Sequence, residues 1–328
     1  MNLAGVVDSL MEVPVVPSFT RVGYQLRSRL DHWTDTATYD LTGRTIVVTG
    51  ATSGLGRHAA EQFAALGAHV VISGRDASKA DTVRREIARR TGSAALTVAC
   101  ADMGELDQVR SMADQLLAEH PTIDVLVHNA GALSGHRSVN ADGIESTVAS
   151  QVLGPFLLTS LLLPSLADAS PGRVLTMSSG GMYAAPLSVG HLQMTDAAFR
   201  GSEQYARAKR AQVTLNEMWA HRIDRSDVVF HALHPGWADT PGVATALPQF
   251  RRLMRPLLRT PAQGADTLVW LAADDGEPLR TSGDFWLDRR RRKIHRLPST
   301  VRSDTPRRRD QLWDWCVAQT DARIGSFS

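Results

Sequence analysis

The sequence predicts a doubly wound α/β fold, in which one parallel sheet of about seven strands carries helices on both faces. From Thr45 onward, short apolar runs rich in β-branched residues alternate with longer stretches of helical periodicity. Gly50, Gly54 and Gly56 lie directly between the first such strand and the first helix. The chain has 328 residues, 43% of them hydrophobic, and is therefore long enough for one large domain with additional segments at its ends.

The alternation of apolar patterns places each expected element along the chain. The expected strands are Thr45–Thr49, His69–Ser73, Ala95–Cys100, Asp124–His128, Arg173–Met177, Val228–Leu233 and Asp284–Leu287. The expected helices are Leu55–Leu66, Ala77–Thr91, Leu106–His120, Ile144–Ala167, Glu203–Arg222 and Ala262–Ala273. Because helices regularly separate the strands, we expect the strands to run parallel and the helices to cover both faces of the sheet.

Two long connections, Gly180–Ser202 and Trp237–Thr260, interrupt this alternation. In a doubly wound sheet, ligands bind beyond the carboxyl ends of the strands, where such loops gather. We therefore expect them to form the walls of a substrate pocket for a bulky apolar molecule, with packing inside the protein as the alternative role. The side chains that suggest this are Met182, Tyr183, Leu187, Leu192, Met194, Phe199, Trp237, Leu247, Phe250 and Met254.

The chain divides into an N-terminal extension (1–41), a catalytic domain (42–288) and a basic tail (289–328). An amphipathic helix is expected in the extension from the spacing of Phe19, Val22, Leu26, Leu30 and Trp33. We favour packing of this helix against the main domain or a second subunit. The alternative is peripheral membrane contact through residues 19–33, with the nearby arginines Arg21, Arg27 and Arg29 facing anionic lipid.

The tail carries a basic run, Arg289–Lys293, and a helix expected around Trp313–Cys316. A run of this kind is typical of a solvated surface, and contact with a phosphate or a partner is the alternative. The net charge of +2 gives no support to nucleic-acid binding. The two cysteines form no C-x-x-C motif, which fits a reducing compartment.

Membrane and secretion signals do not stand out in the sequence. We find no run of about 18 apolar residues that would span a bilayer. The first residues lack a positively charged segment and contain Asp8 and Glu12, which argues against a secretory signal. We therefore expect a cytoplasmic protein, with association at a membrane surface as the alternative, and we expect no metal site.

Tyr205 and Lys209 are the sharpest chemical signal. Their spacing places both side chains on one face of a helix, one turn apart. An ammonium group beside a phenol favours the phenolate and lowers the pKa of the tyrosine, which would make Tyr205 a general acid and base. The alternative is a surface pair without a function. Upstream, Ser178 and Ser179 follow the expected strand Arg173–Met177, where a hydroxyl could hydrogen-bond the same substrate oxygen.

Taken together, these motifs resemble the short-chain dehydrogenase/reductase family. The family's coenzyme loop is matched by Thr49-Gly50-x-x-x-Gly54-x-Gly56, and its other motifs by Asn129-Ala130-Gly131, Ser179, Tyr205-x-x-x-Lys209 and Pro235-Gly236-x-x-x-Thr240. The matches follow the family order over residues 42–287. One branch of the family is resembled more closely by four stretches: Ser178–Met182, Tyr205–Val213, His234–Val243 and Gln263–Leu271. This closer resemblance does not predict a substrate.

The resemblance implies a Rossmann-type fold, a nicotinamide cofactor that supplies hydride, and carbonyl reduction or alcohol oxidation. Tyr205 would be the acid and base, Lys209 would tune it and hold the nicotinamide ribose, and Ser179 would hydrogen-bond the substrate carbonyl. A homodimer or homotetramer through the fifth and sixth helices is also implied.

Two positions depart from the family pattern. Gln151 stands where the family has a fourth catalytic residue, an asparagine that helps to hold a water beside the lysine. The longer side chain could displace that water, so the alternative function is an NADP-binding sensor or assembly protein with little catalysis. His128 replaces the first residue of the family's N-N-A-G motif, and we expect it to be a core or capping histidine.

The expected cofactor is NADP (NADPH). Gly74 stands where members that use NAD tend to have an aspartate, whereas Arg75 and Arg57 offer guanidinium groups to a 2′-phosphate. Asp76 lies twenty residues after Gly56 and could be taken for the acidic residue of a dinucleotide motif, but it could equally cap the next helix. Asp102 is expected either to contact the adenine or to cap a helix. The residues expected to bind the cofactor are Gly50, Thr52, Ser53, Gly54, Leu55, Gly56, Arg57, Arg75, Asp102, Met103, Asn129, Ala130, Gly131, Tyr205, Lys209, Pro235, Gly236 and Thr240.

Overall fold

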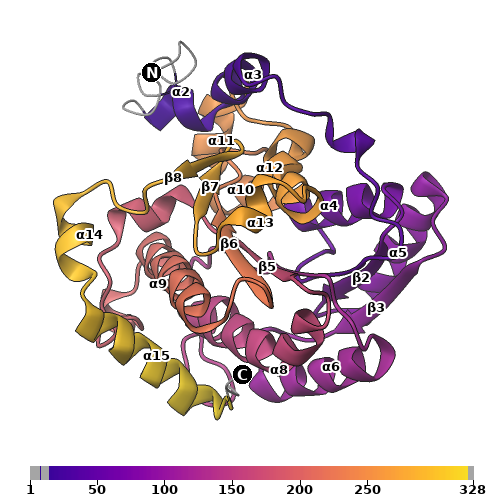
Figure 1. The fold of residues 1–328 in the computed structure, drawn as a ribbon. Helices are drawn as coiled ribbons and strands as arrows, with labels where there is room; N and C mark the ends of the chain where they lie inside the picture. The colour runs from indigo at the N-terminus through magenta and orange to yellow at the C-terminus, as the bar shows by residue number, and fades with distance from the viewer. Residues whose placement is uncertain (1–7, 9–14, 324–328) are drawn as a thin grey trace.

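A computed structural model describes residue 8 and residues 15–323. An eight-stranded sheet in the order β3-β2-β1-β4-β5-β6-β7-β8 forms its centre (Figure 1). The seven expected strands are confirmed as β1 (Thr45–Val48), β2 (His69–Gly74), β3 (Leu96–Cys100), β4 (Val125–His128), β5 (Gly172–Met177), β6 (Val228–Leu233) and β7 (Phe285–Leu287), all parallel. The eighth strand, β8 (Arg290–Arg292), pairs antiparallel with β7 and was not expected.

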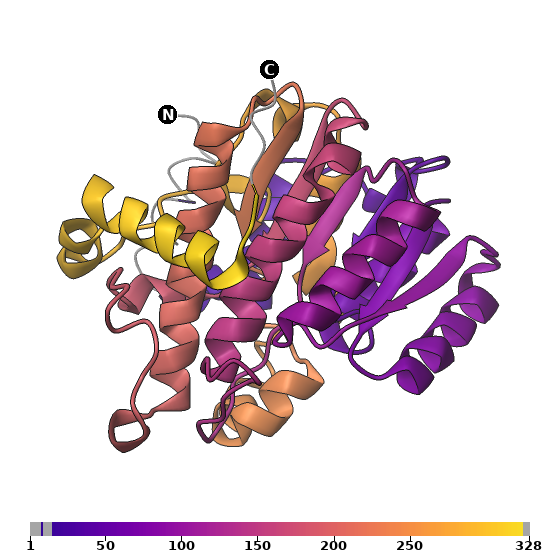
Figure 2. The ribbon, with the colours of Figure 1, turned by 90° about the horizontal axis from the view of Figure 1, so that it is seen from below.

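Helices cover both faces of the sheet, as expected, and each face has its own apolar core (Figures 1 and 2). One core joins the sheet to α4 (Gly54–Ala65), α5 (Ala77–Thr91) and α12 (Pro261–Ala273). The other joins it to α6 (Leu106–Glu119), α8 (Gly154–Ala167) and α9 (Gly201–Arg222). The alternation of side chains along a strand explains the two cores, because in β1 Ile46 and Val48 point to the first and Val47 to the second.

The helix expected over Ile144–Ala167 is divided. It consists of α7 (Ser146–Val148), a π-helical turn η2 (Ala149–Leu153) and α8. Taken as one piece, Ser146–Ala167 is long and apolar enough to cross a membrane, so our expectation that no such run exists is wrong. Of its most apolar window 83% is buried inside the protein, which is typical of the central helix of a core.

The two long connections contain short helices. The first carries η3 (Gly180–Ala184) and η4 (Asp196–Ala198), and the second carries α10 (Pro241–Ala246) and α11 (Pro248–Met254). Four of the side chains expected in a substrate pocket are buried and pack in the cores, so packing is their role: Met182, Tyr183, Leu187 and Leu192. Met194 is also buried. By contrast, Leu247 in the second connection is partly exposed, and the Trp237 ring meets the Phe250 ring edge to face.

The N-terminal extension packs against the main domain, beside α11, α12 and β8 (Figure 1). It forms α2 (Val15–Phe19) and α3 (Arg21–Leu30) in place of one helix, followed by the single turn η1 (Thr36–Thr38). The expected apolar face is wrong in part, because Val22 is exposed whereas Arg27 is buried and faces inward. Arg27 forms ion pairs with Asp8 and Asp288, so it does not face outward toward lipid.

Most of the basic run of the tail is paired with carboxylates. Arg289 pairs with Asp266, Arg290 with Asp31, and Arg292 with Asp8. Two of these carboxylates, Asp8 and Asp31, belong to the N-terminal extension, so the run joins the two ends of the chain. The expectation that the run is solvated is therefore wrong for Arg289, Arg290 and Arg292, whereas Arg291 and Lys293 are exposed as expected.

The last elements are α13 (Glu277–Arg280), α14 (Pro298–Ser303) and α15 (Pro306–Thr320), of which only α15 was expected, around Trp313–Cys316. Helix α15 lies across α9 (Figure 2). The buried Trp313 ring lies 4.7 Å from the Trp219 ring and 5.1 Å from the Phe156 ring, both edge to face. The Arg222 guanidinium lies 3.9 Å above the Trp313 ring, so Trp313, together with the buried Leu312 and Cys316, attaches the tail to the core.

Replacing Trp313 by a small residue should therefore destabilise the whole domain. Trp313→Ala leaves a cavity between α9 and α15, and we expect the free energy of unfolding to fall by about 3–5 kcal/mol. Urea denaturation followed by circular dichroism measures the change. Trp315→Ala is the matched control, because Trp315 is only half-buried. Equal losses for the two variants would contradict the role given to Trp313.

Candidate active site

The glycine loop between β1 and α4 is shaped by close backbone contacts. Gly50 and Gly54 have positive φ angles of 67° and 57°, which favour glycine. A Cβ atom on Gly56 would lie 2.2 Å from the Asn129 side-chain nitrogen. The loop therefore depends on glycine for both its turn and its packing, and its backbone N–H groups at the start of α4 suit the pyrophosphate of a dinucleotide.

The segment Asn129–Gly131 supports this loop from the end of β4. The Asn129 side chain donates hydrogen bonds to the carbonyl oxygens of Thr49 and Gly50, at 3.0 and 3.2 Å. The backbone N–H of Ala130 donates to the Thr49 hydroxyl. On the far side, Gly54 lies against Thr240, whose Cβ would be 3.7 Å from a Cβ at position 54. The structure thus brings the glycine loop, the Asn129 motif and Thr240 together.

Ser179, Tyr205 and Lys209 also meet. Ser179 follows β5, and Tyr205 and Lys209 lie one turn apart near the start of α9. The Ser179 hydroxyl lies close enough to the Tyr205 phenol to lower its pKa. Lys209 Nζ donates a hydrogen bond of 2.9 Å to the carbonyl oxygen of Met177 and lies 5.4 Å from the centre of the Tyr205 ring. One end of β5 therefore positions both the serine and the lysine against the tyrosine.

Burial controls the charges of this group. It raises the pKa of Tyr205 to about 12, although the hydrogen bond from Ser179 acts in the opposite direction. Burial also lowers the pKa of Lys209 to about 7. Our expectation that the tyrosine pKa is lowered is wrong for this structure, because the removal of water from the phenolate raises it and Lys209 is not among the groups that shift it.

Gln151, the departure from the family pattern, lies beside Lys209. It is fully buried on the π-helical turn η2, and its Nε2 donates a hydrogen bond of 2.9 Å to the carbonyl oxygen of Ala132. Its Oε1 has no hydrogen-bond partner among the described residues. A Cβ atom on Gly131 would lie 3.1 Å from Gln151 Oε1 and 3.4 Å from Lys209 Nζ, so these two groups flank Gly131.

A small internal cavity of about 30 Å³ begins at Gln151 and continues between β4, β5, η2 and α9. Its polar walls include His128, Gln212 and Asn216. Nδ1 of His128 and the side-chain oxygen and nitrogen atoms of Gln212 and Asn216 have no hydrogen-bond partner within the described part of the chain. The volume and these polar atoms suit ordered water.

Two of these cavity residues were missed in the sequence. Tyr205, Lys209, Gln212 and Asn216 are spaced by four, three and four residues, so they share one face of α9. That spacing of polar residues on a buried helix face is the signal that could have found Gln212 and Asn216. His128 is a core histidine, as expected, and donates to or accepts from the Thr159 hydroxyl at 2.8 Å; burial, together with Lys209, lowers its pKa to about 3.

At the adenosine end, the structure explains why position 74 is a glycine. A Cβ atom there would lie 2.6 Å from the Thr52 Cγ2 atom, so any side chain at this position would have to displace the Thr52 side chain. Arg75 is exposed, whereas Arg57 is half-buried and pairs with Glu86 at 2.6 Å. Asp76 accepts a hydrogen bond from the Lys79 backbone and caps α5, as one of our alternatives expected.

The remaining predicted cofactor residues have structural partners of their own. Asp102 accepts a hydrogen bond from the Gly104 backbone, and Glu105, rather than Asp102, is the cap residue of α6. Ser53 precedes α4 as its cap residue, and the Leu55 side chain lies close to Gly264. Met103 is buried. Pro235 and Gly236 follow β6, and Gly236 has a positive φ of 72°.

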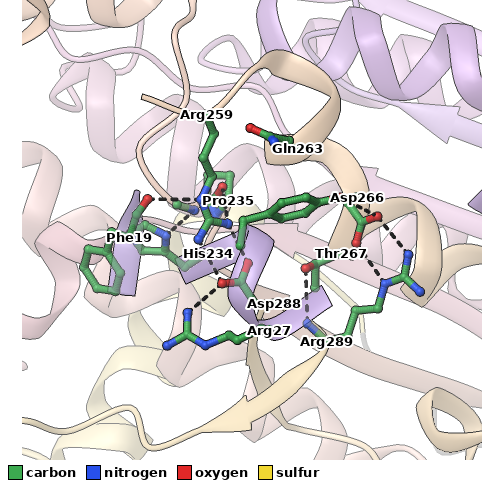
Figure 3. A network of polar contacts seen from close by, with 12 residues as sticks. Phe19, Arg27, His234, Pro235, Arg259, Gln263, Asp266, Thr267, Asp288 and Arg289 are labelled. Carbon is green, nitrogen blue, oxygen red and sulfur yellow. Dashed lines mark hydrogen bonds and ion pairs between the residues drawn. The ribbon is translucent and has the colours of Figure 1, made fainter. Parts of the chain in front are cut away.

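Sequence reasoning also missed the support of this last loop. A Cβ atom on Gly236 would lie 2.2 Å from the Arg259 side chain, which donates to the Pro235 carbonyl oxygen and pairs with Asp288 (Figure 3). Arg259 and Asp288 lie in no family motif that we used, and nothing in their local sequence indicates that they are buried.

Comparison with known proteins agrees with this geometry. The family model described as short chain dehydrogenase matches residues 44–249. The chain is 35% identical over 294 residues to human dehydrogenase/reductase SDR family member 12, covering 90% of this chain and 91% of the relative. It is 39% identical over 251 residues to a Streptomyces protein assigned as a daunorubicin C-13 ketoreductase (76% and 85% covered) and 32% identical over 294 residues to human retinol dehydrogenase 11 (88% and 90% covered).

Solved structures extend the comparison to three dimensions. A Mycobacterium paratuberculosis protein superposes with a TM-score of 0.70 at 25% identity, covering 89% of this chain and 99% of its own. An Escherichia coli short chain dehydrogenase complexed with NADPH gives a TM-score of 0.62 at 25% identity, with 77% and 98% covered. With the site geometry and these relatives in agreement, the chain belongs to the short-chain dehydrogenase/reductase family and is an oxidoreductase.

Proposed function

We propose that this protein is an NADP-dependent reductase of a bulky, apolar ketone or aldehyde, which can also oxidise the corresponding alcohol. The arrangement of Ser179, Tyr205 and Lys209 carries the proposal, because it offers a proton donor and a hydrogen-bond donor to one carbonyl oxygen. Two relatives are named as a daunorubicin ketoreductase and a retinol dehydrogenase, and daunorubicin and retinol are both bulky molecules. For this chain the substrate class is an inference from them and from the apolar second connection.

The proposed roles follow from the charges of the site. Tyr205 is protonated at neutral pH, since its pKa is about 12, and can give its proton to the developing alkoxide. Ser179 hydrogen-bonds both Tyr205 and the substrate oxygen. Lys209, held by the Met177 carbonyl, would stabilise the phenolate that remains. NADPH, when bound, supplies the hydride. Gln151 lies beside Lys209 and also lines the polar cavity, which supports Gln151 as the group through which a proton would return to Lys209.

The residues near the adenosine end support NADP as the cofactor. Position 74 carries no acidic side chain, and Arg75 is exposed to the solvent, where it could meet a 2′-phosphate. The homodimer or homotetramer, the cytoplasmic location and any membrane contact stay predictions. Analytical ultracentrifugation of the purified protein would test the first of them.

The alternative function, a cofactor-binding sensor or assembly protein with little catalysis, also has one supporting observation. Gln151 Oε1 has no hydrogen-bond partner within the described residues, so the water held by the family asparagine has a different neighbour here. We favour the enzyme, because the other three catalytic groups meet in a productive arrangement.

The first prediction concerns the cofactor. We expect NADPH to bind more tightly than NADH, and Arg75→Ala to remove about 1.5–3 kcal/mol of this preference, because the variant loses charge-assisted hydrogen bonds to the 2′-phosphate. Nicotinamide fluorescence during titration measures both dissociation constants. Arg89→Ala, on the exposed side of α5, is the matched control and should change neither. If Arg75→Ala weakens NADH and NADPH equally, Arg75 does not read the phosphate.

The second prediction separates the two functions through Gln151. If the wild-type protein is a working reductase, Gln151→Asn should change kcat by less than about threefold, since the amide group is retained beside Lys209. A rise of about tenfold or more would instead show that glutamine impairs proton return, as the sensor hypothesis requires. Turnover is measured as NADPH consumption with a panel of bulky and small carbonyls. Thermal unfolding of the variant serves as the control for folding.

The third prediction concerns pH. Oxidation of an alcohol needs the phenolate of Tyr205, whose pKa of about 12 lies above the assay range. We therefore expect kcat/KM for oxidation to rise about tenfold per pH unit between about pH 8 and pH 10, whereas reduction, which needs the neutral phenol, should not gain over this range. Initial rates in both directions measure this. Tyr205→Phe should abolish both, and Tyr39→Phe, in the extension, should leave the profile unchanged. A flat oxidation profile would contradict the raised pKa.

A further inference from the structure

The N-terminal extension reaches two loops of the active site through a single ring. The Phe19 ring stacks on His234, with ring centres 4.3 Å apart, and His234 directly precedes the Pro235–Gly236 motif (Figure 3). A Cβ atom on Gly180 would lie 2.9 Å from Phe19 Cε2, and Gly180 directly follows Ser179. Phe19 therefore lies between the serine loop and the loop after β6 and contacts both.

Backbone hydrogen bonds fix this ring in place. The Trp237 N–H donates to the Phe19 carbonyl oxygen at 2.7 Å, and the Arg259 N–H donates to the Trp237 carbonyl oxygen at 2.8 Å. The Arg21 N–H donates to the Leu257 carbonyl oxygen at 3.0 Å. The extension is thus hydrogen-bonded to both sides of the second long connection, so its position and that of the loop are set together.

The buried Arg259 side chain joins the same two segments. It donates to the carbonyl oxygens of Ser18, Phe19 and Thr20 in the extension, and to that of Pro235 in the loop (Figure 3). Gly236 packs directly against this guanidinium, which leaves no room for a side chain there. Arg259 therefore holds the Pro235–Gly236 motif against the extension.

Asp288 closes the network from the turn between β7 and β8. Its carboxylate, fully buried, pairs with Arg259 at 2.5 Å and with Arg27 at 2.6 Å. Arg27 in turn donates to the Ser18 carbonyl oxygen at 2.9 Å. His234 accepts a hydrogen bond from the Gly236 N–H through Nδ1 at 2.6 Å, which requires a neutral ring. Burial lowers the pKa of His234 to about 3 and so maintains that state.

We propose that residues 18–27 are part of the nicotinamide side of the cofactor site, with Phe19 as a positioning residue that sets the spacing between the Ser179 loop and the Pro235–Gly236 loop. The proposal rests on the proposed function, because it assigns these loops to the reacting end of NADP. Phe19 itself contacts the loops and acts through them. Among the residues that the structure describes, no hydrogen bond or ion pair joins the glycine loop or Arg75, at the other end of the site, to residues 18–27, so neither should depend on Phe19.

The test compares a complete cofactor with a fragment of it. NADPH contacts both ends of the site, whereas 2′-phospho-ADP-ribose lacks the nicotinamide ring. We expect Phe19→Ala to weaken NADPH binding and to lower kcat by about tenfold each, while the affinity for the fragment stays unchanged. Val16→Ala, also in α2 but on an exposed residue, is the matched control and should change none of these values. A general loss of structure would weaken both ligands and lower the thermal midpoint.

A second pair of variants keeps the test decisive if Phe19→Ala unfolds. Arg27→Met removes one partner of Asp288 but leaves Arg259, and Arg27→Lys retains the charge. We expect Arg27→Met to weaken NADPH but not the fragment, and Arg27→Lys to restore part of the loss. Arg29→Met, on the exposed side of α3, is the control.

The outcomes distinguish the two proposals. Wild-type protein that binds neither NADPH nor the fragment would overturn the proposed function itself. Wild-type protein that binds and turns over NADPH, with Phe19→Ala and Arg27→Met changing NADPH and fragment affinity equally or not at all, would overturn the positioning role alone. Selective loss of NADPH affinity and of kcat supports it.

Discussion

The carboxylate of Asp288 is the constraint on which the arrangement of the site depends. It lies fully buried between Arg27 and Arg259, and these guanidinium groups hold its pKa below the usual range although burial opposes ionisation. Asp288 and Arg289 both have positive φ angles, a costly conformation for residues other than glycine in a two-residue hairpin turn. The turn is compensated by ion pairs on both residues. Removing one partner of a buried pair typically costs about 3–5 kcal/mol, so the turn, the extension and the loop after β6 are held as one unit.

One face of α9 extends from the end of the sheet into the interior of the protein. Tyr205 and Lys209 lie at the end of the sheet where a substrate can arrive, whereas Gln212 and Asn216 continue the same face into the interior. Because burial acts on both ionisable groups, the tyrosine stays protonated at pH 7, whereas the lysine, with a pKa of about 7, is about half protonated. The site therefore favours proton donation in its resting state. The polar cavity behind Gln151 gives the buried lysine polar neighbours that the apolar core around it does not offer.

Sequence patterns predicted what depends on local periodicity. The seven parallel strands, the six main helices and the meeting of Ser179 with Tyr205 and Lys209 follow from apolar spacing and from motifs that lie at strand ends. Three features did not follow. The burial of Arg27 and of the run from Arg289 depends on carboxylates far away in the sequence, so charge patterning alone suggests a solvated surface. The π-helical turn around Gln151 has no periodic signal. The pKa of Tyr205 depends on how completely the fold removes water, which spacing to Lys209 does not reveal.

The ion pair between Arg27 and Asp288 joins residues that are 261 positions apart. During synthesis the extension leaves the ribosome first, but its acceptor turn between β7 and β8 exists only when nearly the whole chain has been made. Contacts of such high sequence separation form late, because the entropy of closing the loop must be offset by structure that is already in place. The Rossmann-type sheet and the glycine loop can therefore assemble before the extension docks. By this reasoning the glycine loop is complete before the loop after β6 receives its contacts with the extension.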